Sequence, residues 1–368
     1  MRSFWFHTWL LEAPSETDSK GLRVLFGGTD KDRAYFANRF FDGKPRETYQ
    51  GRKWFREISS TARKLDCDLI LTPLLGYLHS APEYDARFAI PNWLTAEVTP
   101  HRSDVEEGRT KSRRRDIKQL QKHNLSYKVT TAESSLSHFY HSMYVPTMKA
   151  SHSDGVLLMG FDHMMGRRKA GECELVVITH NDEDIAGSLI AYDQGRPRLW
   201  SEGILNADRN YLKLGTGMAI YLFSFRHLLE NGHKTINVGR SRAFLSDGAL
   251  YFKKRLGIEV SHATEFAYAL QINNLSEGAR ECLVANPFIF LSGSELHAAV
   301  FMKANSLKAD DVWTYIWRSY NLQGISQIAL FVLDGQQAND TIRVPDQYAG
   351  RIQIRQLAAS VPASGRGG

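Results

Sequence analysis

Apolar and polar residues alternate along this 368-residue chain with periods that distinguish helices from strands. The clearest pattern follows the sequence Leu214-Gly215-Thr216-Gly217. Apolar residues there recur at the spacing of one buried helical stripe: Met218, Tyr221, Leu222, Phe225, Leu228 and Leu229. Asn231-Gly232 ends this helix with residues that tolerate a left-handed backbone. Residues 196–205 and 235–238 have the pattern of strands, so we expect a strand, a glycine turn, a helix and a second strand in succession.

The glycine turn at 214–217 has two interpretations. A strand, a turn and a helix start expose unpaired backbone N–H groups at the positive end of the helix dipole, and this arrangement suits a pyrophosphate. The alternative is an ordinary corner whose glycines only relieve backbone strain, because a lone G-x-G is a weak motif. The sequence leaves both open.

The same periods divide the chain into segments. Before residue 100 they predict strands at 22–26, 68–72 and 93–98 and helices at 30–41 and 53–65. After a polar linker at 101–108 they predict helices at 109–122, 134–149 and 161–169 and strands at 126–131, 174–179, 185–192 and 197–204, with hairpin turns at Asn181-Asp182 and Gln194-Gly195. Farther on, 287–291 has the pattern of a strand and 294–305 that of a helix. We expect an N-terminal α/β half at 1–105, a second domain at 106–271, a C-terminal α/β appendage at 272–358 and a disordered tail at 359–368.

Composition narrows the class of protein. A hydrophobic content of 43% is typical of a globular chain. No apolar run reaches the roughly eighteen residues of a membrane span, and we expect a first strand and not a signal peptide at the N-terminus. Three distant cysteines without a C-x-x-C argue against a disulfide framework or a zinc site and favour a reducing cytoplasm. His138 and His141 stand one helical turn apart without a third ligand at a recognisable spacing, so we expect no metal.

Positive charge is concentrated in one segment. The formal net charge is +6, and much of the excess lies in 109–122, RTKSRRRDIKQLQK, with Asp116 as its single acid. Basic clusters attract phosphates, nucleic acid or acidic membrane surfaces, so peripheral membrane contact stays open. The alternative is a solvated helix face that docks through the narrow apolar edge of Ile117 and Leu120.

The order of the elements, the L-G-T-G loop and the block from Asn237 to Gly257 resemble the GNAT acyltransferase superfamily. Within it, the chain is most similar to the branch of the Fem peptidyltransferases and the CelD-like acyltransferases of bacterial polysaccharide operons. A basic helix like that at 112–117 and a lysine four residues ahead of a glycine, here Lys253 ahead of Gly257, are typical of that branch. The resemblance covers about 111–271. It implies an α/β (α+β layered) fold, a GNAT-like mixed sheet flanked by helices, with the first hundred residues as a degenerate GNAT-like half of a tandem.

The resemblance also implies a chemistry. Such enzymes transfer an acyl group from a thioester, or from an aminoacyl-tRNA, directly to an amine, which requires a base and donors for an oxyanion. Glu202 would be the base and Lys253 would meet a donor phosphate or stabilise developing charge. Contacts to acyl-CoA would come from Ile204, Leu205, Leu212, Lys213, Leu214, Gly215, Thr216 and Gly217. Contacts to the acceptor would come from Tyr144, His152, Asp162, Trp200, Arg240 and Arg242.

Alternatives stay open for several of these residues. Glu202 could be a carboxylate on the solvent-facing side of a strand. Lys253 could be a solvated lysine whose charge interacts favourably with a helix dipole, and Arg240 and Arg242 could be partners in surface ion pairs. Leu212 also stands where the GNAT phosphate loop usually has Gln or Arg.

We therefore expect a cytoplasmic N-acyltransferase that uses acyl-CoA and acts on an amine of a sugar, nucleotide-sugar or cell-envelope precursor. One rival keeps the fold and takes aminoacyl-tRNA as donor, with Arg113, Arg114, Arg115 and Lys118 touching RNA phosphates. The other rival is a GNAT-like scaffold without activity, and it is supported by Leu212 at the position where Gln or Arg is usual.

Overall fold

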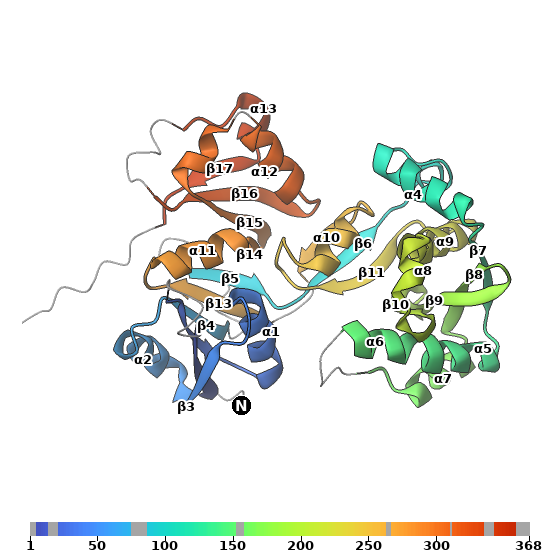
Figure 1. Cartoon of the computed structure of the whole chain (residues 1–368), viewed down its shortest axis with the longest axis horizontal. Helices are drawn as coiled ribbons and strands as arrows, with labels where there is room; N and C mark the ends of the chain where they lie inside the picture. The colour runs from blue at the N-terminus through green and yellow to red at the C-terminus, as the bar shows by residue number, and fades with distance from the viewer. Residues whose placement is uncertain are drawn as a thin grey trace, which may run out of the picture. The chain divides into compact units, whose positions relative to one another are not determined.

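The computed structural model describes residues 5–13, 21–74, 87–151, 158–262, 266–309, 311–334 and 342–357. The chain forms two compact units (Figure 1). The first comprises Met1–Leu94, Arg240–Arg255 and Val260–Gly368, and the second comprises Thr95–Gly239 and Leu256–Glu259. The chain thus begins in the first unit, continues through the second unit and then returns to the first unit. His152 and the predicted tail at 359–368 lie outside the described residues.

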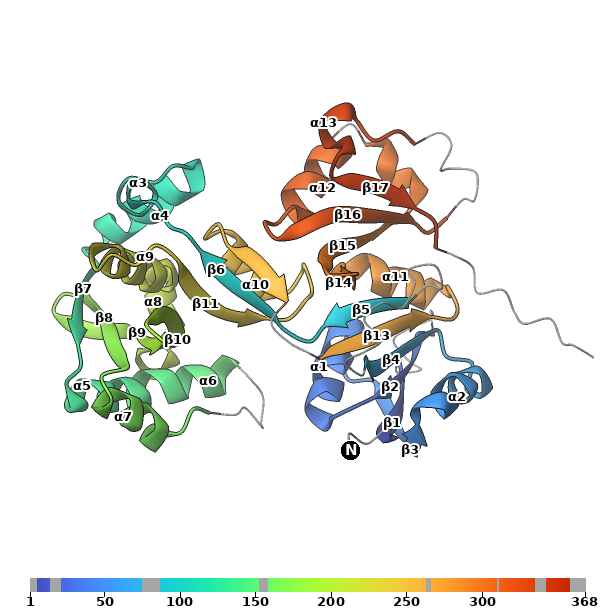
Figure 2. The same ribbon diagram turned by 180° about the vertical axis from the view of Figure 1, so that it is seen from behind.

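The first unit is built on a ten-stranded mixed sheet with the order β17-β16-β15-β14-β5-β13-β4-β2-β1-β3 (Figure 2). Its strands are β1 Trp5–Glu12, β2 Arg23–Gly27, β3 Arg46–Trp54, β4 Leu69–Leu74, β5 Arg87–Pro91, β13 Ala267–Ile272, β14 Phe288–Ser292, β15 Glu295–Met302, β16 Ile325–Val332 and β17 Ile352–Arg355. Its helices are α1 Asp30–Phe40, η1 Phe55–Glu57, α2 Ile58–Lys64, α10 Gly248–Lys254, α11 Glu277–Ala285, η5 Ala304–Lys308, α12 Val312–Tyr320 and α13 Asp346–Ala349.

The C-terminal strands continue the sheet that the N-terminal strands begin. β14 pairs with β5 through Leu291 and Ala89, and β13 lies between β5 and β4. The segment 272–358 therefore shares a sheet with 1–94. The helix predicted at 294–305 is wrong, because β15 occupies most of it and runs parallel to β16. Its interior positions are all buried, as is typical of a strand covered on both faces.

A buried ion pair joins the part of the chain that follows the second unit to the first helix of this unit. A guanidinium nitrogen of Arg242 lies 2.8 Å from a carboxylate oxygen of Asp32 on α1. The hydroxyl of Tyr268 donates to the other oxygen at 2.9 Å. The rings of Tyr35 and Trp93 lie 4.5 and 4.2 Å from the guanidinium carbon. Partners on every side allow these two charges to remain buried.

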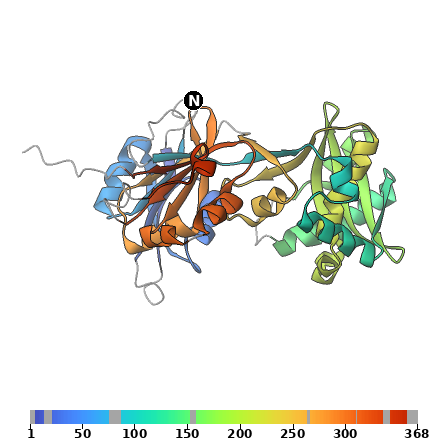
Figure 3. The same ribbon diagram turned by 90° about the horizontal axis from the view of Figure 1, so that it is seen from above.

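The second unit contains a seven-stranded sheet with the order β12-β6-β11-β10-β9-β8-β7, flanked by helices coloured teal to yellow in Figure 3. Its strands are β6 Leu94–Val98, β7 Ser126–Thr130, β8 Cys173–His180, β9 Glu183–Asp193, β10 Arg196–Ile204, β11 Ile236–Ser241 and β12 Glu259–His262. Its helices are α3 Arg102–Glu106, α4 Lys111–Lys122, α5 Glu133–His138, the π-helix η3 Phe139–Tyr144, α6 Val145–Ser151, α7 Phe161–Lys169, η4 Leu205–Ala207, α8 Arg209–Lys213 and α9 Thr216–Glu230. The boundary between the units falls inside β6, β11 and β12.

Two mixed sheets flanked by helices confirm the predicted fold class. The hairpins of β8, β9 and β10 and the long helix α9 lie where the sequence predicts them. Both hairpin turns have positive φ angles, 49° and 64° at Asn181 and Asp182 and 52° and 77° at Gln194 and Gly195. The helix predicted at 53–65 is wrong at its start, because β3 extends to Trp54. In the parts of the chain that the structure describes, no helix is long and apolar enough to cross a membrane.

Gly203 allows the π-helix η3 to pack directly on β10. A Cβ atom at this position would lie 2.6 Å from the carbonyl carbon of Met143 and from the amide nitrogen of Tyr144. These are backbone atoms, which cannot turn away as a flexible side chain would. The close approach fixes the distance between η3 and the end of β10.

Gly203→Ala should therefore lower the free energy of unfolding by about 1–3 kcal/mol or more, because the added methyl overpacks a rigid contact. Gly166→Ala is the matched control, since a Cβ at Gly166 on α7 meets no atom within 4 Å. Alanine there should stabilise by about 0.5–1 kcal/mol through its helix propensity. Thermal unfolding followed by circular dichroism measures both. Equal melting temperatures for the two variants would contradict the close contact.

Candidate active site

Strand β10 carries the predicted base and changes its pairing along its length. It pairs antiparallel with β9 from Arg196 to Ile204, with a register shift at Trp200. Its parallel pairing with β11 is recorded at Arg198 and Asn237. In the described structure, the end of β10 from Ser201 onward is therefore paired with β9 and not with β11. A strand edge of this kind offers backbone groups and side chains to a ligand.

Glu202 lies on this end of β10 and is half-buried. The hydroxyl of Tyr221 on α9 donates to its carboxylate at 3.4 Å. Burial, and next the charge of Glu202, raise the pKa of Tyr221 well above 10. The phenol therefore stays protonated at neutral pH and acts as a donor to the carboxylate. The sequence analysis placed Tyr221 in the apolar stripe of the helix and missed this contact. The only feature of the sequence that could have indicated it is the hydroxyl group of this tyrosine among apolar residues.

A hydroxyl from α6 holds the residue at the end of β10. Thr147 Oγ1 accepts from the N–H of Ile204 at 2.9 Å and donates to its carbonyl at 3.2 Å. The N–H of Ile204, a predicted contact to acyl-CoA, thus already has a hydrogen-bond partner in this structure. Leu205 follows in η4 and packs against the core formed by η3 and α7. Thr147 belongs to no motif that the sequence presents.

The glycine turn leads into α9 without a side-chain cap. Gly215 has a φ of 95° and is the N-cap of α9. The first N–H groups of a helix lack intrahelical partners, so those of Thr216 and Gly217 are available to an anion. The Thr216 hydroxyl donates to the Tyr211 carbonyl at 2.7 Å and does not cap α9. The structure thus shows an uncapped helix start at this turn, and phosphate binding there stays a prediction.

The residues before Gly215 shape one side of the turn. Leu212 is 47% exposed, and its side chain lies against Gly217. The Lys213 ammonium donates to the Asn210 side chain at 2.9 Å, and Leu214 is the C-cap of α8. An exposed leucine therefore stands where the GNAT phosphate loop usually has Gln or Arg.

The basic helix α4 packs on this turn. Gln119 donates to the carbonyl of Lys213 at 2.8 Å, and a Cβ on Gly215 would lie 3.0 Å from the Gln119 Cγ. Arg113 is buried, lies 3.5 Å from Asp104 and donates to the Met218 sulfur. The expected contact of Arg113 with RNA phosphates is therefore wrong, because its guanidinium anchors α4 to α3 and α9. Arg114, Arg115 and Lys118 remain exposed.

The predicted acceptor residues of the second unit have different surroundings. Tyr144 is buried, and its hydroxyl accepts from the Met159 N–H at 2.8 Å, so it shapes the core. Asp162 is exposed in the first turn of α7. Trp200 stands at the register shift, with the guanidinium groups of Arg167 and Arg198 5.3 and 5.6 Å from its ring. In the described residues no group of three or more His, Cys, Asp or Glu side chains could hold a metal ion.

Lys253, Arg240 and Arg242 belong to the first unit. Lys253 is buried, and its ammonium donates to the carbonyl of Arg240 at 2.9 Å, whereas the Arg240 side chain is exposed. Arg242 is buried and forms an ion pair with Asp32, so its predicted contact with the acceptor stays a prediction. The neighbouring Lys254, which the motif did not single out, donates to the carbonyls of Arg318 and Ser319. Burial lowers the pKa of Lys254 to about 8.

The chain is similar to the solved structure of FemX, with 10% identity over 72% of this chain and 83% of that chain and a TM-score of 0.36. It is similar to L-PGS from Bacillus licheniformis (13% identity, 76% and 85% of the two chains, TM-score 0.35) and to a GCN5-related N-acetyltransferase-like protein from Streptococcus suis (12%, 72% and 82%, TM-score 0.27).

No curated protein matches the sequence significantly. Residues 108–254 match the family model described as an acetyltransferase (GNAT) domain. This match covers α4, the strands β7–β11, the glycine turn and α10, which are the elements that carried the resemblance in the sequence. Residues 108–254 of this chain are therefore a GNAT-type acyltransferase domain.

Proposed function

We propose that the protein is an N-acyltransferase that moves an acyl group from acyl-CoA to an amine of a sugar, nucleotide-sugar or cell-envelope precursor. The observation that carries the proposal is the position of Glu202, which is half-buried on the end of β10 that is not paired with β11. Its carboxylate accepts a hydrogen bond from Tyr221 of α9. In a GNAT-type domain this is a carboxylate beside a strand edge that a thioester can use.

Backbone groups and cations together favour a diphosphate donor. The amides of Thr216 and Gly217 begin α9, where the dipole is positive. Arg114, Arg115 and Lys118 on α4 add positive potential, since α4 packs on the same turn through Gln119. Neither contribution needs the Gln or Arg that Leu212 replaces.

Direct transfer then needs one proton acceptor on the protein. Glu202 takes a proton from the acceptor ammonium, and the freed amine attacks the carbonyl carbon of the thioester. A C–N bond forms, the C–S bond breaks, and the thiolate of CoA leaves with the electron pair of that bond and takes up the second proton, which the nitrogen loses as the amide forms. Tyr221 keeps its own proton, because its pKa lies far above neutral pH, and it orients the carboxylate. We propose Trp200 and Asp162 as the acceptor contacts of the second unit.

A second donor is supported by one observation. Arg114, Arg115 and Lys118 form an exposed basic face on α4, as phosphate contacts in an aminoacyl-tRNA would require. Transfer from aminoacyl-tRNA would be lost steeply as salt increases, whereas transfer from acetyl-CoA would change much less. The two donors can thus be told apart in one assay.

Glu202→Gln should lower kcat about 10²-fold or more, because the amide cannot accept the proton. The measurement is thiol release from acetyl-CoA in the presence of a panel of amino sugars and nucleotide-amino sugars. Glu107→Gln is the matched control, since Glu107 is an exposed carboxylate of the same unit, and its rate should not change. An unchanged rate in Glu202→Gln would remove Glu202 from the mechanism.

Tyr221→Phe should move the acidic limb of the pH profile of kcat/KM to higher pH. The carboxylate loses a donor that favours its charged form, so its pKa rises and the base is lost at a higher pH than before. Tyr127→Phe is the control, because its hydroxyl donates to Glu230 at 3.3 Å and no role in transfer is proposed for that pair. A limb that stays in place in Tyr221→Phe would show that the contact does not orient the base.

A further inference from the structure

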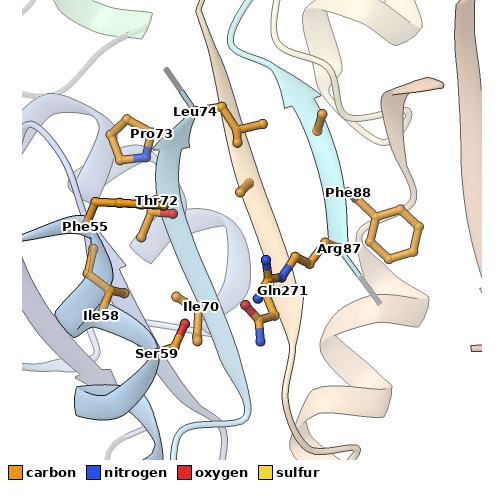
Figure 4. Close-up of a pocket in the computed structure, with 12 residues that line it drawn as sticks. Phe55, Ile58, Ser59, Ile70, Thr72, Pro73, Leu74, Arg87, Phe88 and Gln271 are labelled. Carbon is orange, nitrogen blue, oxygen red and sulfur yellow. The ribbon is translucent and has the colours of Figure 1, made fainter. Parts of the chain in front are cut away.

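The first unit contains a pocket on one face of the central strands β4, β13 and β5 (Figure 4). It has a volume of about 180 Å³, and η1 and α2 form its wall through Phe55 and Ile58. β13 lies in the middle of the ten-stranded sheet, where side chains on both faces are usually covered. Ala269 and Gln271 of β13 are nevertheless partly exposed. This face of the sheet, which forms the floor of the pocket, is therefore accessible to solvent at Ala269 and Gln271.

The hollow results from a row of small side chains across three strands. Ala269 pairs with Thr72 of β4 on one side and with Ala89 of β5 on the other. Two alanines and a threonine side by side leave a space that larger side chains would fill. Ile58 and Leu74 border this space with apolar surface. An apolar group of a ligand would lie over the alanines.

The next row of the floor is polar. Gln271 pairs with Ile70 on one side and with Arg87 on the other, and Figure 4 shows Gln271 and Arg87 next to each other. The Gln271 amide nitrogen donates to the Asn273 side chain at 2.9 Å, which fixes its orientation. Arg87 is exposed. The pocket thus has an apolar body and a cationic end.

We propose that this pocket binds a small amphipathic carboxylate. The carboxylate would receive hydrogen bonds from the Arg87 guanidinium, whose planar fork matches two oxygens. The alkyl or aryl body would cover Ala269 and Ala89 and contact Ile58 and Leu74. The site uses residues of the first unit alone, so it does not depend on the proposed acyl transfer.

Octanoate is the probe, titrated into the full-length protein by isothermal titration calorimetry, with 1-octanol as the uncharged analogue. We expect saturable binding of octanoate to the wild type. Ala269→Phe fills the hollow over the alanine row and should abolish binding of both probes. Arg87→Gln should weaken octanoate about tenfold or more and leave 1-octanol unchanged. Arg52→Gln, an exposed arginine of β3 in the same unit, is the control and should bind like the wild type.

The far-ultraviolet circular dichroism of each variant shows whether it remains folded, and Ala269→Leu gives a milder filling if the phenylalanine disrupts the sheet. Octanoate binding that survives both fillings, or no saturable binding to the wild type, would overturn the site. Binding that is lost on filling but unchanged in Arg87→Gln would overturn the assignment to a carboxylate.

Discussion

The lack of a side chain at Gly215 is the constraint on which the second unit depends. Gln119 and Leu120 of α4 occupy the space that a Cβ there would need, at 3.0 and 3.2 Å, and the φ of 95° suits glycine alone. Gly215 stands between the C-cap of α8 and the first residue of α9, and Gln119 of the basic helix donates to the carbonyl of Lys213 at the same turn. The uncapped start of α9 and the nearby positive charge of α4 therefore lie at the same packed turn. The direction of α9 in turn places Tyr221 against Glu202.

Two residues that the family resemblance suggested have local functions in the first unit. Arg242 neutralises Asp32, and Lys253 donates to the backbone carbonyl of Arg240. Both groups are buried charges, and a buried charge without a partner is costly. The pair of Arg242 with Asp32 is therefore part of what holds residues 240–255 to α1, whereas the contact of Lys253 lies within that segment. A position in a motif does not by itself distinguish this structural use from a contact with substrate.

The parts of the fold that could be predicted from the sequence depend on local signals. The apolar stripe of α9 and the turns at Asn181-Asp182 and Gln194-Gly195 are set by neighbours within a few residues. β15 was missed because Leu, Ala and Met favour a helix locally, whereas pairing with β14 and β16 overrides that preference. The position of β13 between β5 and β4 also depends on partners far along the chain.

The same distinction between local signals and contacts far along the chain applies to the candidate site. Glu202 and the glycine turn could be proposed from the residues and the resemblance. Thr147 and Tyr221 could not, because their contacts join different elements, to Ile204 and Glu202 respectively. The burial of Arg113 has the same origin, since Met218 and Asp104 meet it only after α3, α4 and α9 have packed.

Calorimetric titration with CoA and with pantetheine, which lacks the diphosphate, tests the donor site most directly. Gly217→Asp places a negative charge at the start of α9, and a side chain there would make only ordinary contact with Leu212, at 3.5 Å. We expect the wild type to bind CoA, to bind pantetheine about tenfold more weakly or worse, and to lose CoA in Gly217→Asp. Equal affinity for CoA and pantetheine, or CoA binding that Gly217→Asp leaves unchanged, would contradict a diphosphate site at this turn.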